Sequence, residues 1–260
     1  MPSPSVVYED EDVLVLDKPA GEFVSTGRGK RKASLTLMDR WRATHGEGVS
    51  NAHRLDAEVS GVVVCARNKI ALDRLTGQFQ SKSVKRTHGA LVIVSTLEEA
   101  RRICLVEPSS APIPADEFSI GFALGPDQHD ADRMHVYRRK GGRPALSRFR
   151  VLERFGRYAW VEAIPETSRE HQLQAHLASV GFPVLGDAVY GLPDQRLMLS
   201  ELKRGYKGRA TERPLLDRLA LHLHEVTLKH PASGETLTFT SDWPKEFEIA
   251  LRNLRKFARS

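Results

Sequence analysis

The segment His53-Arg54-Leu55-Asp56 and the apolar run after it constrain the fold of this chain more than any other feature. Arg54 and Asp56 lie two residues apart in a polar stretch, and the apolar run Val-Val-Val-Cys-Ala begins at residue 62. A short, bounded apolar run of this kind is typical of a buried strand. Such an arrangement can hold one carboxylate at the mouth of a sheet, with a guanidinium nearby. A lone loop aspartate more often caps a turn, so the other motifs of the chain decide the role of Asp56.

Hydrophobic periodicity predicts an α+β fold. Residues 6–17 read as a β-hairpin, Asn68 is placed to cap a helix that runs to about Gln80, and prolines between 107 and 128 predict a loop-rich crossing. Further strands are expected at 89–94, 147–154, 159–164 and 219–223, and further helices at 35–44, between Ser168 and Gly181, and as an amphipathic C-terminal helix at about 245–258. Many hairpin-connected strands with few helices predict a single domain over residues 1–260, built on a mixed, largely antiparallel sheet.

Composition and charge restrict the class of partner. Hydrophobic residues make up 40% of the 260 and charged residues 28%, which is ordinary for a globular protein. A net charge of +6 suits a polyanion. The basic residues gather at 28–32, 101–102, 138–140, 203–209 and 252–256. No apolar run approaches the roughly 20 residues that span a bilayer.

Two further features of the sequence bear on where the protein works. The first residues lack the basic and apolar parts of a signal peptide. Two cysteines form neither a disulfide framework nor a zinc site, and Cys65 is expected to be a small core residue. We therefore expect a monomer in the reducing cytoplasm, with no membrane partner.

Five blocks of the sequence, in order, resemble the RluA-type RNA pseudouridine synthases. The loop at 53–61 is similar to the catalytic pattern H-R-L-D-x-x-[TS]-S-G of that family, with Val59 in place of the usual Thr or Ser. The second block is the K-P-x-G turn at 18–21, and the third is Arg-Glu-His-Gln-Leu-Gln-Ala-His at 169–176, which is similar to the family pattern R-T-H-Q-I-R-x-H. The fourth is Gly-Phe-Pro-Val-Leu-Gly-Asp at 181–187 with Tyr-Gly at 190–191. The fifth is Arg-Leu-Ala-Leu-His at 218–222 with His-Pro-Ala-Ser-Gly at 230–234. They span most of the chain.

The resemblance implies a fold and a set of roles. The expected fold is one extended mixed sheet, flanked by helices, with an RNA-binding cleft across its middle. Asp56 is the expected catalytic residue, and Arg54 is expected to fill the space that the flipped base leaves or to contact the phosphate backbone. Some relatives carry an S4-type RNA-binding domain before the catalytic part. The first catalytic strand begins here by residue 6, so recognition is expected to come from the catalytic domain and its loops.

The implied reaction is the isomerisation of uridine to pseudouridine in structured rRNA or tRNA. It breaks the C1′–N1 bond, turns the base and joins its C5 to C1′, without redox change, so no cofactor is needed. One carboxylate suffices, either by attacking C1′ or by removing the 2′ proton, and the sequence does not separate these routes. His171 and His176 lie five apart rather than at the i,i+4 spacing of helical metal ligands, and we assign no metal.

Two positions depart from the family pattern. The family motif R-T-H-Q-I-R has two arginines, one of which is expected to pair with the catalytic aspartate; here the first is Arg169 and the second is Gln174. The family's base-stacking tyrosine is His88, whose imidazole can stack over a smaller area. We therefore expect Arg54, His88, Arg169 and Gln174 to form the RNA-binding set around Asp56. The alternative is a catalytically weakened or inactive RNA-binding paralogue.

Overall fold

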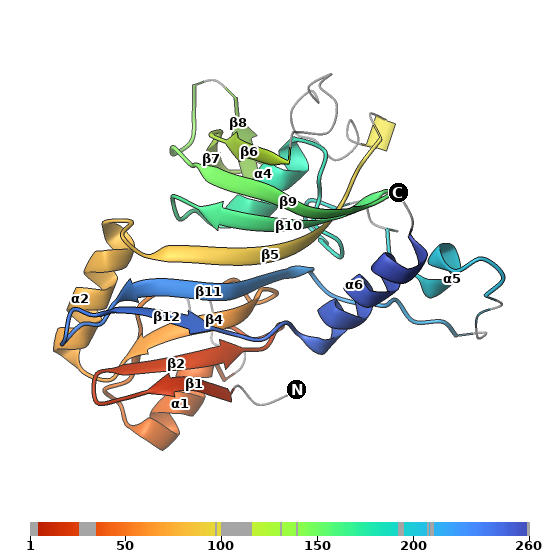
Figure 1. Ribbon diagram of the computed structural model, residues 1–260. Coiled ribbons are helices and arrows are strands. Elements are labelled where there is room, and N and C mark those ends of the chain that lie inside the picture. The colour runs from red at the N-terminus through yellow and green to blue at the C-terminus, as the bar shows by residue number, and fades with distance from the viewer. Residues whose placement is uncertain are drawn as a thin grey trace. The chain divides into compact units, whose positions relative to one another are not determined.

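The computed structural model describes residues 5–25, 35–96, 98–99, 116–130, 132–138, 140–191, 195–206, 208 and 211–258 (Figure 1). The chain folds into two compact units. Unit 1 consists of residues 1–87 and 222–242, and unit 2 of residues 88–221 and 243–260. The basic stretches at 28–32 and 101–102 lie outside the described residues.

Unit 1 is a twisted sheet covered on its two faces by different helices. Its strands pair in the order β1-β2-β4-β11, all antiparallel except the parallel pair β4 and β11; β3 also pairs with β4, and β12 with β11. The elements are β1 (Ser5–Glu9), β2 (Val13–Lys18), α1 (Leu37–His45), β3 (Ser50–Asn51), β4 (Ser60–Ala66), α2 (Lys69–Gln80), β11 (Leu221–Lys229) and β12 (Thr236–Thr240).

Strands β2 and β4 are buried on both faces, which explains their continuous apolar runs. Side chains alternate along a strand, so each face receives its own hydrophobic cluster. One cluster packs Val62 and Val64 against Leu75 of α2, and the other packs Val63 and Cys65 with α1. Burial raises the pKa of the Cys65 thiol to about 12, as expected of an inert core residue.

Unit 2 contains an antiparallel sheet with the strand order β5-β10-β9-β6, a separate hairpin of β7 and β8, and the helices α4, α5 and α6. The elements are β5 (Lys85–Ile93), most of which lies in this unit, β6 (Glu117–Ile120), β7 (Ala123–Pro126), β8 (Met134–Tyr137), β9 (Ser147–Phe155), β10 (Tyr158–Pro165), α4 (Gln172–Ser179), α5 (Leu199–Leu202) and α6 (Lys245–Phe257). In α6, the buried side chains are Phe247, Ala250, Leu251 and Leu254.

The structure confirms the predicted α+β class and its largely antiparallel, mixed sheet. Asn68 caps α2 by accepting a hydrogen bond from the Ala71 N–H at 2.8 Å. The loop predicted between 107 and 128 is wrong at its end, because β6 and β7 lie there. These strands are four residues long, and β7 contains a glycine and a proline, so neither has a readable strand pattern. None of the described helices is both long and apolar enough to cross a membrane.

Candidate active site

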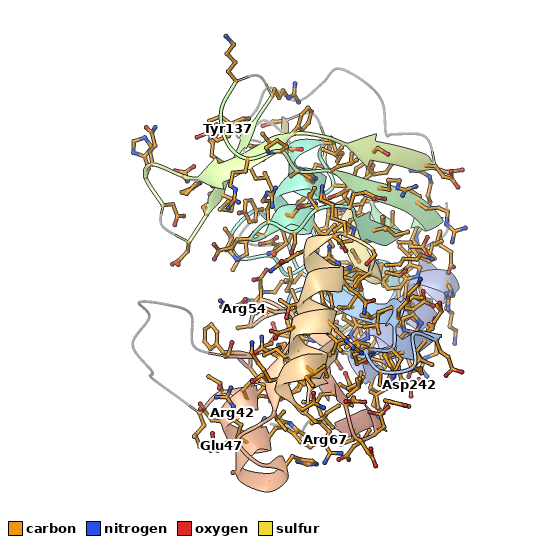
Figure 2. The ribbon with its side chains drawn as sticks, turned by 90° about the vertical axis from the view of Figure 1, so that its left-hand side faces the viewer. Arg42, Glu47, Arg54, Arg67, Tyr137 and Asp242 are labelled. Carbon is orange, nitrogen blue, oxygen red and sulfur yellow. The ribbon has the colours of Figure 1, made fainter. Side chains whose placement is uncertain are left out.

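The reactive loop, residues 52–59, connects β3 to β4 in unit 1. Leu55 packs against both hydrophobic clusters of the unit. Of its two neighbours, Arg54 is exposed (Figure 2), and Asp56 is half-buried like Leu55 itself. The backbone N–H of Val59 donates to the Asp56 carbonyl at 3.2 Å and closes a turn directly after the aspartate. The loop therefore packs the apolar residue of the motif against the core and leaves the charged residues on either side of it within reach of solvent.

His53 fixes the start of the reactive loop. Its carbonyl accepts a hydrogen bond from Asn51 Nδ2 at 2.9 Å, and its ring nitrogen Nε2 accepts one from the Val64 backbone N–H at 3.0 Å. The imidazole also stacks on Phe79 of α2, with 4.6 Å between ring centroids. Burial of the ring, and less so the nearby Arg86 guanidinium, lowers the pKa of His53 to about 3. His53 is thus a neutral structural acceptor rather than an acid or base of the reaction.

Lys18, of the K-P-x-G turn, fixes the other side of the loop. This fully buried side chain donates from Nζ to the carbonyl oxygens of Pro19, Glu22 and Ala57, at 2.9, 2.8 and 2.9 Å. The Ala57 carbonyl also accepts the Gly21 N–H at 2.7 Å. Hydrogen bonds to a charged donor are stronger than those between neutral groups. The backbone next to the aspartate is therefore held by two donors from one turn.

The end of the loop is joined to β11 by a close approach of two backbones. Gly61 has φ +121°, and a Cβ atom there would lie 2.1 Å from the Leu223 carbonyl oxygen. Only glycine fits such a position. The parallel pairing places Ser60 opposite His222, and Ser60 Oγ lies 2.9 Å from His222 Nδ1. His222 is a supporting residue that our site prediction omitted, although the block at 218–222 carried its signal.

In unit 2, the segment between β10 and α4 carries Arg169. Its Nη1 donates to the Ser168 carbonyl at 2.9 Å, and its buried Nε has no hydrogen-bond partner among the described residues. His171, the residue before α4, has φ +50°. This left-handed conformation is rare for a residue with a side chain. The helix therefore begins at Gln172, later than the sequence predicted.

Gln174 contacts a residue that sequence reasoning did not pair with it. Only 5% of its surface is exposed, and its Nε2 donates to Asp187 Oδ2 at 3.1 Å. Asp187 Oδ1 accepts the backbone N–H groups of Val189 and Tyr190 at 2.9 and 3.0 Å. Burial raises the pKa of Asp187, and these hydrogen bonds partly oppose that rise. Gln174 thereby connects α4 to the loop of the G-D-x-x-Y-G motif.

His88 lies in β5 with 6% of its surface exposed, opposite Ala163 of β10. The structure therefore divides the predicted site residues. Asp56 and Arg54 share the reactive loop of unit 1, whereas the other three, His88, Arg169 and Gln174, belong to unit 2.

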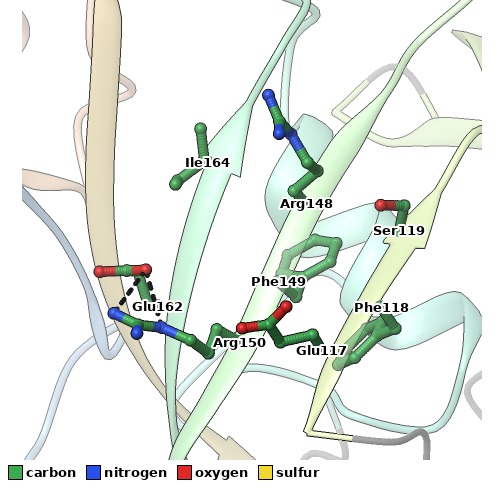
Figure 3. A pocket seen from close by; sticks show the side chains of 8 residues that line it. All are labelled: Glu117, Phe118, Ser119, Arg148, Phe149, Arg150, Glu162 and Ile164. Carbon is green, nitrogen blue, oxygen red and sulfur yellow. Dashed lines mark hydrogen bonds and ion pairs between the residues drawn. The ribbon is translucent and has the colours of Figure 1, made fainter.

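An open groove of about 400 Å³ on unit 2 lies elsewhere, on β6, β9 and β10 (Figure 3). None of the predicted site residues lines it. Its arginines are matched by carboxylates, since Arg150 pairs with Glu162 at 3.1 Å and Arg148 pairs with Glu166. Such a neutralised surface is a poor match for a phosphate backbone.

Comparisons with known proteins agree with the motifs. A family model described as RNA pseudouridylate synthase matches residues 12–179. The chain is 32% identical over 261 residues to the ribosomal large subunit pseudouridine synthase D of Xanthomonas campestris pv. campestris, covering 97% of this chain and 70% of the relative. It is also 32% identical to the synthase D of Pseudomonas aeruginosa, over 96% of this chain and 72% of that protein.

A solved structure supports the fold. Human RNA pseudouridylate synthase domain containing 4 aligns with a TM-score of 0.65 at 24% identity, over 96% of this chain and 92% of that one. At this identity the match shows the fold alone. Family model, relatives and fold agree, and the chain therefore belongs to the RNA pseudouridylate synthase family, whose members are isomerases that act on RNA.

Proposed function

We propose that this protein is an active synthase in which Asp56 is the catalytic carboxylate. The observation that carries the proposal is the way the backbone around Asp56 is held. His53 fixes the loop before it, and Lys18 and Gly21 both donate to the carbonyl of Ala57 after it. The residue Asp56 as a whole is half-buried. A reactive group held on a rigid backbone and open to a substrate is what positional catalysis requires.

The proposed chemistry needs no added group. The C1′–N1 bond of uridine breaks, the C5–C1′ bond forms, C5 loses its proton and N1 gains one, so atoms and electrons balance. Asp56 either attacks C1′ as a nucleophile or removes the 2′ proton as a base. In both routes the uridine must first leave its stack, at an expense of a few kcal/mol that contacts with the rest of the RNA offset.

We propose that Arg54 and Arg169 contact the RNA and that Gln174 acts through the loop it holds. Arg54 is exposed beside Asp56, and the Arg169 side chain is partly exposed on the segment before α4. Gln174 already donates to Asp187. His88 has only 6% of its surface exposed, which leaves little of its ring for a base. If Gln174 has this structural task, its replacement of the second arginine of the family motif requires no loss of catalysis. The Gln174 contact therefore favours the active enzyme over the inactive paralogue.

We further propose rRNA of the large ribosomal subunit, rather than tRNA, as the substrate, and the cytoplasm as the place of action. The support is the names of the relatives, which include ribosomal large subunit pseudouridine synthases D and C from several bacteria.

The test is tritium release from C5-tritiated uridine in transcripts of large-subunit rRNA, small-subunit rRNA and tRNA. We expect the wild-type protein to release tritium from large-subunit rRNA, Asp56→Ala to release none, and the matched control Glu58→Ala, which removes an exposed carboxylate from the same loop, to match the wild type. RNA binding without release by any of the three proteins would support the inactive paralogue.

A further inference from the structure

Phe23 is an exposed aromatic residue on the segment that holds the reactive loop. The residue is 51% exposed, although its neighbours Glu22 and Val24 are only 7% and 2% exposed. Among the large hydrophobic side chains that the described part of the chain leaves exposed, Phe23 is the single aromatic. A single exposed apolar side chain is ordinary on a protein surface, so what distinguishes Phe23 is its place on the segment that holds the reactive loop.

The backbone under Phe23 is held at three successive carbonyls. The Glu22 carbonyl accepts Lys18 Nζ at 2.8 Å, that of Phe23 accepts the Leu37 N–H at 2.9 Å, and that of Val24 accepts the Met38 N–H at 3.0 Å. The Val24 side chain packs into the cluster beneath α1. The ring of Phe23 is therefore presented from a fixed backbone, which lowers the entropy lost when it binds a partner.

The same segment is joined to the backbone beside Asp56. Gly21 N–H and Lys18 Nζ both reach the Ala57 carbonyl, at 2.7 and 2.9 Å. Phe23 follows Gly21 by two residues, which is at most about 7 Å of chain. Arg54, also exposed, lies on the loop being held. Two hydrogen-bonded segments of unit 1 thus present an exposed ring and an exposed guanidinium.

We infer that Phe23 stacks on an unpaired base of the RNA substrate, an inference that rests on the proposed function. Proteins that bind unpaired RNA combine aromatic faces for the bases with cations for the backbone, and stacking tolerates any base because every base has a π-face. Phe23 carries no charge and no proton, so it contributes binding rather than chemistry. With Phe23 as a contact, the RNA-binding site extends from Asp56 over the K-P-x-G turn.

The first experiment measures Kd, KM and kcat for an rRNA fragment with three variants. Loss of one stacked base is expected to raise Kd and KM about 10-fold for Phe23→Ala, with kcat at saturating RNA unchanged. Phe23→Trp, which keeps a stacking face, is expected to restore both. Ile70→Ala, which truncates a 68% exposed side chain on α2, is the matched control and is expected to leave all three constants unchanged.

The second experiment gives a readout that does not need turnover. In an Asp56→Ala background, the added fluorescence of Phe23→Trp is expected to be quenched as rRNA is titrated. This titration tests the stacking of residue 23 on RNA even if the wild-type protein isomerises no RNA and the proposed function fails.

Three results would overturn the inference. One is wild-type Kd and KM for Phe23→Ala, and another is an equal loss in Ile70→Ala. The third is altered self-association of Phe23→Ala with RNA binding unchanged, which would place the ring in a contact between protein copies.

Discussion

At the scale of single residues, individual side chains hold the backbone around Asp56. His53 is the clearest case, because its unprotonated Nε2 is required as an acceptor for the Val64 N–H. The folded state lowers the pKa of this imidazole to about 3, from an ordinary value near 6.5. The unfolded chain therefore binds this proton more readily, and His53 opposes folding as the pH falls below about 6.5.

This difference predicts a pH dependence of stability. His53→Gln keeps an acceptor oxygen but does not titrate. The free energy of unfolding of the wild type should fall by about 2 kcal/mol more than that of the variant between pH 7 and pH 5, because the folded pKa lies below this window and the unfolded pKa within it. Urea unfolding at a series of pH values measures both. Parallel pH profiles of the two proteins would show that the His53 proton is not coupled to folding.

Gln174 supports a second prediction at this scale, since its amide already has a partner in Asp187. We expect the double variant Gln174→Arg, His88→Tyr, which restores the family residues, to gain no activity over the parent. The larger buried side chains should lower stability by about 1–3 kcal/mol. Tritium release and thermal unfolding measure the two effects. A tenfold gain in kcat would instead show that these two positions limit catalysis, as expected if the protein is a catalytically weakened paralogue.

At the scale of elements, the approach of β4 to β11 fixes where the reactive loop ends. Gly61 permits that approach, because any Cβ there would overlap the Leu223 carbonyl. Gly77 in α2 is a matched control in the same unit, since no atom lies within 4 Å of the position its Cβ would take.

The two glycines should respond in opposite directions to the same substitution. Gly61→Ala is expected to lower the free energy of unfolding by more than about 3 kcal/mol, through overlap and a strained positive φ. Gly77→Ala is expected to raise it by about 0.5–1 kcal/mol, because alanine favours a helix. Denaturant unfolding measures the free energy of unfolding of both variants. A Gly61→Ala protein as stable as the wild type would contradict the close approach of β4 to β11.

What the sequence predicted at this scale depended on local patterns. The apolar run of β4, the Asn68 cap and the C-terminal helix were correct because each is set by residues close together in the chain. The strands β6 and β7 were missed because four residues are too few to show a clear period, and β7 also contains a glycine and a proline. The Gln174–Asp187 hydrogen bond joins residues 13 apart and depends on tertiary packing, which no motif specifies.

At the scale of the whole molecule, the positive charge suits RNA, but the structure shows that not every basic residue is available to it. Arg255 of the C-terminal helix pairs with both carboxylate oxygens of Glu153, and this pairing lowers the pKa of Glu153. The groove of unit 2 is likewise neutralised by ion pairs. The net charge predicted that the partner is a polyanion. Which part of the protein surface binds that partner depends on which cations the fold leaves unpaired. The five motif blocks identified the family because they carry the loop, its supports and their order.

The proposed function requires that Asp56 performs chemistry rather than holding the loop or the RNA. The most direct measurement is a single-turnover reaction of excess protein with large-subunit rRNA, followed by digestion and quantification of pseudouridine, for the wild type and Asp56→Asn. We expect pseudouridine from the wild type, none from the variant, and equal Kd values for RNA. Pseudouridine formed by Asp56→Asn at the wild-type rate would contradict the proposed function.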